Sequence, residues 1–208
     1  MPKITAAQRE TRRQSILEAA LVCFSRDGFH NTTTADIVRE AGVSQGTLYL
    51  YFATKDDIIV ALADDRHQRE AFLNALAQRE PDPLRGLLTL FDLHGDGLRD
   101  GDRLDARRVG VQGWAEALRS PRIHDSVVAG LTTVRDAIVR LIERGQHTGQ
   151  IRAEIDAEAL ARTLIATYQG MVLQLAWGEN IDHAACRQLM RDIIGGLLTP
   201  TGRASYAP

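Results

Sequence analysis

Short polar side chains follow one another between residues 44 and 47, in a pattern suited to contact with nucleic acid. These residues are Ser44, Gln45, Gly46 and Thr47. At the N-terminal end of a recognition helix, small or polar side chains allow the backbone to enter the major groove of DNA. Gln45 is the best candidate for reading a base, because its amide can form two hydrogen bonds with adenine N6 and N7. The segment therefore favours recognition of duplex DNA.

Further residues could bind the phosphates that flank the bases. Lys55 is expected at the start of a helix, where its charge would add to free backbone N–H groups and form a phosphate clamp. Thr33 and Thr34 could act in the same way at the start of an earlier helix. Thr47 carries a hydroxyl and a methyl group, so it could contact either a base edge or a phosphate.

Aromatic and apolar side chains complete this candidate surface. Tyr49 and Tyr51 are two residues apart and cannot share one face of a helix, so at least one should point its hydroxyl toward DNA. Leu50 could press a thymine methyl group or contact only sugar. The predicted DNA contacts are Thr33, Thr34, Ser44, Gln45, Gly46, Thr47, Tyr49, Leu50, Tyr51 and Lys55.

Helices must position these side chains. The spacing of apolar residues predicts a first helix from Ala6 to Asp27, which Gly28 ends. Thr33, with Asp36 three residues later, is a capping-box start for a second helix that ends at Ala41.

A glycine-containing turn follows the second helix. Gly42 breaks the helix, and Ser44 caps a third helix from Gln45 to Tyr51. Two short helices joined in this way are typical of a helix-turn-helix. A structural reading stays open for single residues, in which Ser44, Thr33 and Thr54 only cap helices and the tyrosines are half-buried core.

A fourth helix should begin after Thr54 and end at the two prolines of segment 80–83. Its expected inward residues are Ile58, Leu62, Phe72 and Leu76. A short helix is predicted over 84–93, then a solvated Gly- and Asp-rich loop over 94–103. Further helices are predicted over 104–118, 122–146, 157–177 and 183–198. The fold class is therefore all-α.

Residues 33–56 resemble the DNA-binding head of the TetR (tetracycline repressor) family. The resemblance runs from residue 16 to 62 and centres on Gly-Thr-Leu-Tyr-x-Tyr-Phe-x-x-Lys, from Gly46 to Lys55. Leu50 departs from the polar or aromatic residues common at its place.

The resemblance implies a division of the chain and a function. It implies a three-helix head in residues 1–56, joined by the fourth helix to a helical effector-binding and dimerisation domain in 57–200, with a tail at 201–208. It also implies a repressor that binds a palindromic operator in double-stranded DNA as a homodimer and is released by a small, largely apolar effector. An activator of the same fold is the alternative.

The helix predicted over 157–177 has apolar residues on more than one face, so both faces need cover. A second subunit could supply it, packed against the last helix in a four-helix bundle. The predicted dimer interface comprises Leu164, Tyr168, Val172, Leu189, Ile193 and Leu197.

Candidates for the effector pocket mix aromatic surface with a few polar tips, although ordinary core is the alternative reading. They are Phe91, His94, Trp114, His124, Tyr168, Met171, Gln174 and Trp177.

Composition narrows the classes of function. Residues 1–55 hold seven cations and five anions, and the whole chain has a net charge of −2, so a weakly basic head precedes an acidic remainder. Cys23 and Cys186 are expected to be free thiols. No apolar run suggests a membrane span or a signal peptide, which predicts a cytoplasmic protein. No catalytic, metal-binding or nucleotide-binding spacing is present, so we expect neither an enzyme nor a cofactor. A helical module that binds protein rather than DNA is a second alternative.

Overall fold

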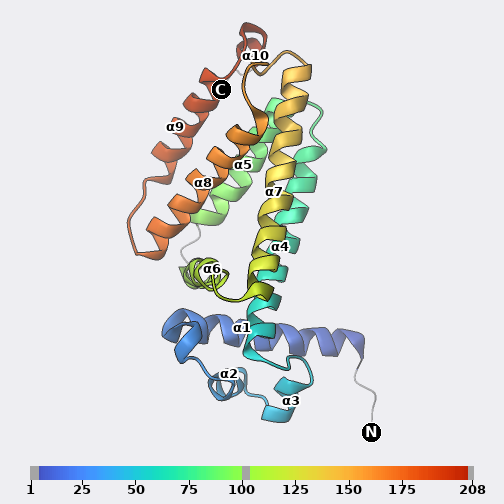
Figure 1. The fold of residues 1–208 in the computed structure, drawn as a ribbon, viewed down its shortest axis with the longest axis vertical. Helices are drawn as coiled ribbons and strands as arrows, with labels where there is room; N and C mark the ends of the chain where they lie inside the picture. The colour runs from blue at the N-terminus through green and yellow to red at the C-terminus, as the bar shows by residue number, and fades with distance from the viewer. Residues whose placement is uncertain (1–4, 100–103, 206–208) are drawn as a thin grey trace. The chain divides into compact units, whose positions relative to one another are not determined.

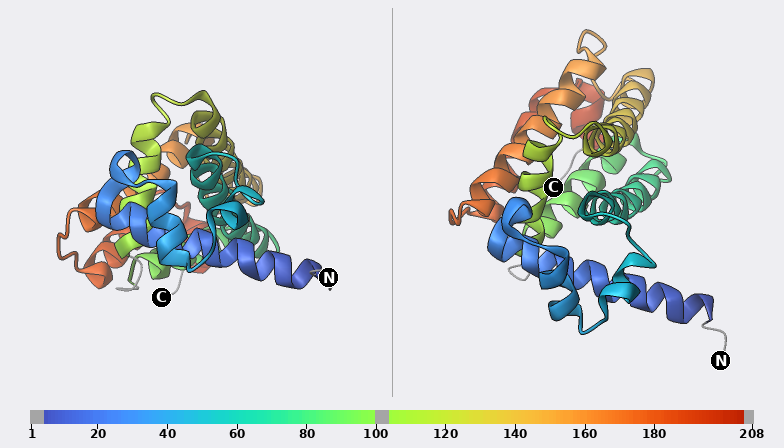
Figure 2. Two further views of the ribbon diagram at one scale, coloured as in Figure 1. Left: turned by 90° about the horizontal axis from the view of Figure 1, so that it is seen from below. Right: turned by 60° about the horizontal axis from the view of Figure 1, so that its bottom comes forward.

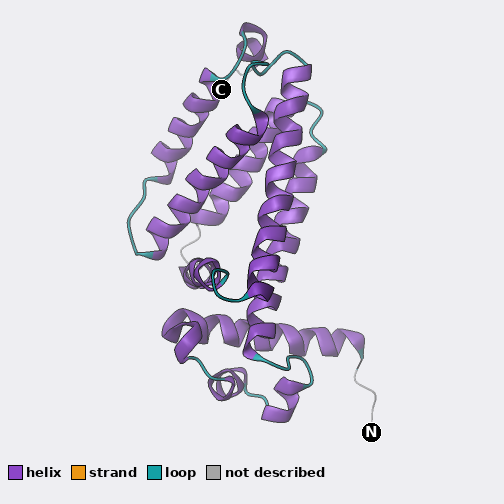
Figure 3. Cartoon of the chain, in the orientation of Figure 1, coloured by secondary structure: helices purple, strands orange, loops and turns teal. Residues whose placement is uncertain are grey.

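Helices make up nearly all of the secondary structure. The computed structural model describes residues 5–99 and 104–205, and side chains are described outside 93–105. Figure 3 shows helices and loops in this part of the chain and no strand, which confirms the predicted all-α class. The helices, labelled in Figure 1, are α1 Ala6–Asn31, α2 Thr34–Ala41, α3 Gln45–Tyr49, α4 Lys55–Gln78, α5 Pro83–Arg99, α6 Leu104–Glu116, α7 Pro121–His147, α8 Ala157–Ala176, α9 His183–Gly196 and α10 Pro200–Ser205.

The chain packs as two compact units. Unit 1 comprises residues 1–66 and 105–128, and unit 2 comprises 67–104 and 129–208. Unit 1 thus contains α6 and the start of α7 in addition to α1, α2 and α3. Both α4 and α7 contribute residues to each unit. The predicted boundary after residue 56 separates the DNA-binding domain from the effector-binding domain, and it stays a prediction.

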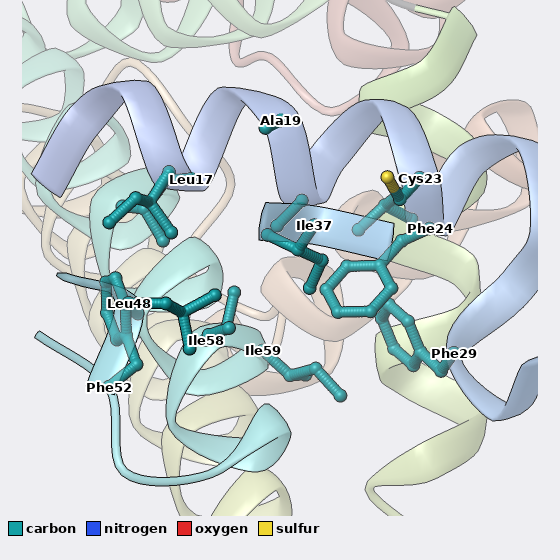
Figure 4. Packing of buried hydrophobic residues seen from close by; sticks show 14 of the residues in the cluster. Leu17, Ala19, Cys23, Phe24, Phe29, Ile37, Leu48, Phe52, Ile58 and Ile59 are labelled. Carbon is teal, nitrogen blue, oxygen red and sulfur yellow. The ribbon is translucent and has the colours of Figure 1, made fainter. Parts of the chain in front are cut away.

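The core of unit 1 forms on one face of α1. Ile16, Leu17 and Phe24 are fully buried there, and α2 and α3 lie on the same side of α1 in the views of Figures 1 and 2. The ring of Phe29 meets that of Phe24 edge to face, with centroids 4.8 Å apart, as the close-up in Figure 4 shows. Gly28, at a φ of 79°, breaks the helix so that Phe29 can turn back, as predicted.

The turn between α2 and α3 also follows the prediction. Thr33 and Asp36 form a capping box, and Gly42 ends α2 in the left-handed conformation at a φ of 62°. The predicted third helix is two residues too long, because α3 ends at Tyr49. The backbone N–H groups of Tyr51 and Phe52 both donate to the carbonyl of Leu48, which tightens the chain into a turn.

The inward face of α4 was partly mispredicted. Ile58 is fully buried as expected, but Phe72 is 68% exposed and Leu76 is 45% exposed. The buried residues at this end of the helix are Asn74 and Ala77. Consecutive residues are turned by about 100° on a helix, so the inward and outward faces are only one or two residues apart in the sequence. The predicted inward stripe was off by this amount, and both apolar residues lie on the outer face. Phe72 therefore does not pack into the core of unit 2.

The predicted loop over 94–103 is also wrong in its first part, because α5 continues to Arg99. A glycine inside a helix costs only about 1 kcal/mol relative to alanine. The helix buries Leu84, Leu87 and Leu90, and that burial outweighs the cost of its glycines. Residues 100–103 lie outside the described part of the chain.

The segment predicted as a tail contains the short helix α10. An isolated bridge pairs Ile151 with Leu198, and the N–H of Thr199 donates to the carbonyl of Gln150 at 2.9 Å. Gly202 is buried, and a Cβ at that position would lie 2.1 Å from the same carbonyl. The close fit holds α10 against the loop that follows α7.

The remaining helices, α6 to α9, begin and end within two residues of their predicted bounds. In unit 2, α7, α8 and α9 enclose a core to which α4 and α5 also contribute. Its fully buried large side chains are Leu84, Leu141, Ile142, Ile194 and Leu198.

Asn74 is an exception within this apolar surrounding. It is 4% exposed, and neither its side-chain nitrogen nor its oxygen has a hydrogen-bond partner among the described residues. One turn further along α4, Gln78 donates to the carbonyl of Ala137 at 2.6 Å, so the neighbouring amide is satisfied. A buried polar group without a partner costs about 1–3 kcal/mol.

We therefore predict that Asn74→Leu stabilises the fold. Leucine has nearly the same shape and no polar atom, so the free energy of unfolding should rise by about 1–2 kcal/mol. Urea unfolding followed by circular dichroism measures the change. Gln78→Leu is the matched control and should destabilise, because it leaves the carbonyl of Ala137 without this donor. A less stable Asn74→Leu protein would contradict the prediction.

Candidate DNA-binding site

Helix α3, the predicted recognition helix, is anchored in the core on one side and exposed to solvent on the other. Leu48 is fully buried and anchors the helix in the core, whereas Tyr49 is 50% exposed and Leu50 is 74% exposed. Ser44 caps the helix by accepting the N–H of Thr47, and the two hydroxyl oxygens lie 2.8 Å apart. Gln45 and Gly46 are also exposed. The structure thus brings these predicted contact residues onto one accessible part of the head.

Three polar side chains are joined across the helix-turn-helix. Nε2 of Gln45 donates to Oγ1 of Thr34 at 3.2 Å. Hydrogen bonds with Gln45, and then with Thr34, hold the pKa of Tyr49 below its usual value. A neighbour lowers the pKa of a phenol when it donates to the phenolic oxygen, because that bond favours the ionised form. Thr34, Gln45 and Tyr49 form what we call the reading cluster.

The side chain of Thr33 forms hydrogen bonds within the head itself. Its Oγ1 accepts the N–H of Asp36 and donates to that carboxylate at 2.6 Å. The side-chain bond from Thr33, followed by its backbone N–H, lowers the pKa of Asp36. Thr54 and Asp57 form the equivalent pair at the start of α4. The capping roles left open for Thr33, Ser44 and Thr54 are thus confirmed, and the phosphate contact predicted for Thr33 stays a prediction.

Lys55 has an internal role that sequence reasoning missed. Its Nζ donates to the carbonyls of Phe29 and Thr32, the latter at 3.1 Å. An ammonium group has three N–H donors, so two are committed inside the protein and one is left for a phosphate. The signal that could have revealed this role is Gly28, because a broken helix leaves carbonyls without partners.

A second side chain, that of Gln112, bonds backbone groups next to the same break in α1. Oε1 of Gln112, from α6, accepts the N–H of Phe29 at 2.9 Å, and its Nε2 donates to the carbonyl of Phe24 at 3.1 Å. Both residues belong to unit 1. No sequence pattern predicts this contact, since Gln112 lies more than 80 residues from Phe24 and Phe29 along the chain.

Two arginines of α1 lie over aromatic rings in the turn that follows α3. The guanidinium of Arg9 lies 5.9 Å from the centre of the Tyr51 ring, and that of Arg13 lies 5.9 Å from the ring of Phe52. Tyr51 is half-buried, so Tyr49 is the more exposed tyrosine, consistent with the argument that the two cannot share a face. Arg9 is exposed and was absent from the predicted set.

The predicted effector residues are divided between the two units. Trp114 and His124 belong to unit 1, where Arg66 lies 5.8 Å from the centre of the Trp114 ring. In unit 2, Phe91, Tyr168 and Met171 are half-buried, whereas Gln174 and Trp177 are exposed. The side chain of His94 lies outside the described ones. These assignments stay predictions.

Two residues of the predicted dimer interface are covered by their own chain. Leu164 and Val172 are buried within unit 2, on the inward stripe of α8 with Ala161 and Leu175. The predicted interface as a whole stays a prediction. Leu189 is 61% exposed and Ile193 is 48% exposed, so α9 does present apolar surface. Tyr168 and Leu197 are half-buried.

Other kinds of site lack support in the described part of the chain. No group of three or more His, Cys, Asp or Glu residues there is arranged to hold a metal ion. None of the described helices combines the length and apolar character needed to span a membrane. Cys23 and Cys186 are free thiols, as predicted.

Comparison with known proteins agrees with the geometry of the head. The family described as "Bacterial regulatory proteins, tetR family" matches residues 16–62, and "BetI-type transcriptional repressor, C-terminal" matches residues 98–199. The transcriptional regulator UidR of Escherichia coli strain K12 is 25% identical over 92% of this chain and 95% of its own length. The transcriptional repressor AcnR of Corynebacterium diphtheriae is 24% identical over 88% of this chain and 90% of its own.

Solved structures show the same architecture. GusR of Salmonella enterica superposes with a TM-score of 0.71 at 27% identity, covering 95% of this chain and 99% of its own. A transcriptional regulator from Saccharomonospora viridis, in complex with choline, gives a TM-score of 0.74 at 29% identity over 91% of this chain and 98% of its own. Together with the two family matches, they show that the chain belongs to the TetR family of DNA-binding bacterial transcriptional regulators.

Proposed function

We propose that this protein is a repressor that binds a palindromic operator as a dimer and is released by a small molecule. The observation that carries the proposal is the exposed polar face of α3, anchored by the buried Leu48 and flanked by the capped start of α2. A helix presented in this way suits the major groove. Repression rather than activation is supported by the match to a repressor C-terminal domain and by the similarity to AcnR.

In this proposal Gln45 reads a base and Lys55 contacts a phosphate. Gln45 is exposed and close to Thr34 and Tyr49, whereas Lys55 keeps one N–H and its charge available beyond its two internal bonds. Base contacts carry sequence preference, and phosphate contacts strengthen binding to every sequence.

The two residues should therefore respond differently to substitution. Gln45→Ala is expected to lose preference at one symmetric pair of operator positions, at a cost of about 1–3 kcal/mol. Lys55→Met keeps the aliphatic stem and removes the charge, so affinity should fall on all duplexes, with a salt slope smaller by about 1. Fluorescence anisotropy over a series of salt concentrations measures both. An equal loss on all sequences from both variants would contradict the assignment.

The dimer is proposed to use the outer face of α9. Leu189 and Ile193 lie four residues apart and therefore share a helix face, and both are exposed in the single chain. Apolar surface of this kind is typically covered by a partner, and two-fold symmetry would place the same face of each subunit against the other.

Ile193→Asp is predicted to give monomers, because the seam would have to bury a charge without a partner. Sedimentation velocity measures the result. Leu118→Asp is the matched control, since Leu118 is 88% exposed in unit 1 and its replacement should leave the dimer intact. A dimer that survives Ile193→Asp would place the interface elsewhere.

The effector is proposed to bind within unit 2, with Asn74 as its polar anchor. An amide that is buried without a partner is costly, and such groups in native proteins commonly have a role beyond packing. The choline bound to the Saccharomonospora regulator shows that a relative of this architecture accepts a small organic molecule. For this chain we propose a small, largely apolar compound with one hydrogen-bonding group.

Release from DNA requires that the effector bind the free protein better than the operator-bound protein. The helices α4 and α7, which continue from one unit into the other, are the proposed route of coupling. Mass spectrometry of the purified protein would identify retained ligand. Calorimetry should then show that saturating operator weakens this ligand by about 5- to 150-fold. Equal affinities with and without operator would rule out release by this ligand.

A further inference from the structure

The arginines of the head differ in how their charges are compensated. Among those in residues 5–56, the ones that form ion pairs with carboxylates of unit 1 are Arg13, Arg26 and Arg39. The other two, Arg9 and Arg12, are exposed, and neither has a carboxylate partner among the described residues. They lie three residues apart on α1 and therefore share one face of the helix. Uncompensated positive charge is thus gathered near the start of α1.

Arg9 lies next to the turn that follows the recognition helix. Its guanidinium is 5.9 Å from the centre of the Tyr51 ring. The N–H groups of Tyr51 and Phe52 donate to the carbonyl of Leu48, the residue that anchors α3 in the core. The turn that carries the Tyr51 ring is therefore held by α3 itself, and Arg9 lies beside the recognition segment.

We infer that Arg9 and Arg12 form a second contact with DNA, at phosphates beside the groove that α3 enters. This inference rests on the proposed function, in which α3 and the reading cluster lie in the major groove. A recognition helix contacts base edges with its N-terminal residues. The turn after its other end is then directed toward the wall of the groove, which is the sugar–phosphate backbone.

The surroundings of Arg9 suit it to bind phosphate. A guanidinium group is planar and carries five N–H donors in its plane, so a contact of its face with an aromatic ring leaves the donors available. Phosphate oxygens can accept two parallel hydrogen bonds from such a group. Because the Tyr51 ring already restrains the side chain, less rotamer freedom is lost when the phosphate binds.

Arg13, one turn further along α1, shows the opposite arrangement. Its guanidinium lies 5.9 Å from the centre of the Phe52 ring, but its N–H groups donate to Glu10 at 3.2 Å and to Asp65 at 3.4 Å. Its charge is compensated within unit 1, so it holds α1 against α4 and is not assigned to the DNA surface.

The salt dependence of binding tests this surface in the whole protein. Each phosphate that a cation neutralises steepens the fall of log affinity with log salt concentration by about 0.9. The probes are a duplex that the wild-type protein selects from a random pool and an unrelated duplex. Arg9→Gln and Arg12→Gln should each reduce the slope by about 0.9 per subunit on both duplexes, and the double variant by about 1.8. Arg9→Lys keeps the charge and should keep the slope.

Arg85→Gln is the matched control for the loss of one positive charge. Arg85 is also an exposed arginine without a carboxylate partner among the described residues, but it belongs to unit 2. Its replacement should leave the salt slope unchanged. Arg9 and Arg12 are exposed as well, so all variants should keep the helical circular dichroism of the wild-type protein.

Neutral phosphates in the duplex then locate the contact. A methylphosphonate group keeps the sugar–phosphate backbone but removes one negative charge, and it is placed at each position of the selected duplex in turn. The wild-type protein should lose affinity at one or two phosphates in each half-site to which the double variant is insensitive. If the arginines only stabilised the turn after α3, the double variant would be as sensitive at these phosphates as the wild-type protein.

The outcomes separate this inference from the proposed function. An unchanged salt slope in the double variant would overturn the inference, as would an equal reduction in Arg85→Gln. Methylphosphonate losses that persist in full in the double variant would also overturn it. If the wild-type protein selects no motif and binds duplexes without dependence on salt, the proposed function itself fails.

Discussion

The break in α1 at Gly28 is the constraint on which the head depends. It turns the chain so that Phe29 packs edge to face against Phe24, but it also leaves backbone groups without helical partners. Lys55 supplies donors for two of the carbonyls, and Gln112 satisfies one N–H and one further carbonyl. Residues from α4 and α6 thus complete the end of α1.

The same contacts determine where the recognition helix lies. Lys55 is the first residue of α4, and the tight turn after Leu48 leads directly to it. The bonds from Lys55 therefore fix one end of the segment that carries α3, while the capping boxes of Thr33 and Thr54 fix the helices on either side. Internal hydrogen bonds and the buried Leu48 therefore hold the exposed face of α3 in place.

Local chemistry made the head largely predictable from sequence. Caps, breaking glycines and apolar spacing act over a few residues, so Gly28, Thr33, Gly42 and Ser44 all have the predicted roles. The failures concern packing at longer range. Phe72 was assigned to the wrong side of its helix, because a long helix with apolar residues on several faces leaves the inward direction ambiguous. The role of Lys55 required knowledge of which carbonyls lie nearby in space.

The pairing of Ile151 with Leu198 bears on how unit 2 opens. Together with the bond from Thr199 to Gln150, it closes the chain into a loop that contains all of α8 and α9. Once a loop is closed, the segments inside it have much less conformational entropy to gain by separating from the core. These two helices should therefore exchange their amide hydrogens as one cooperative segment, with a common opening free energy. Fraying at the end of the chain would be confined to residues beyond this closure.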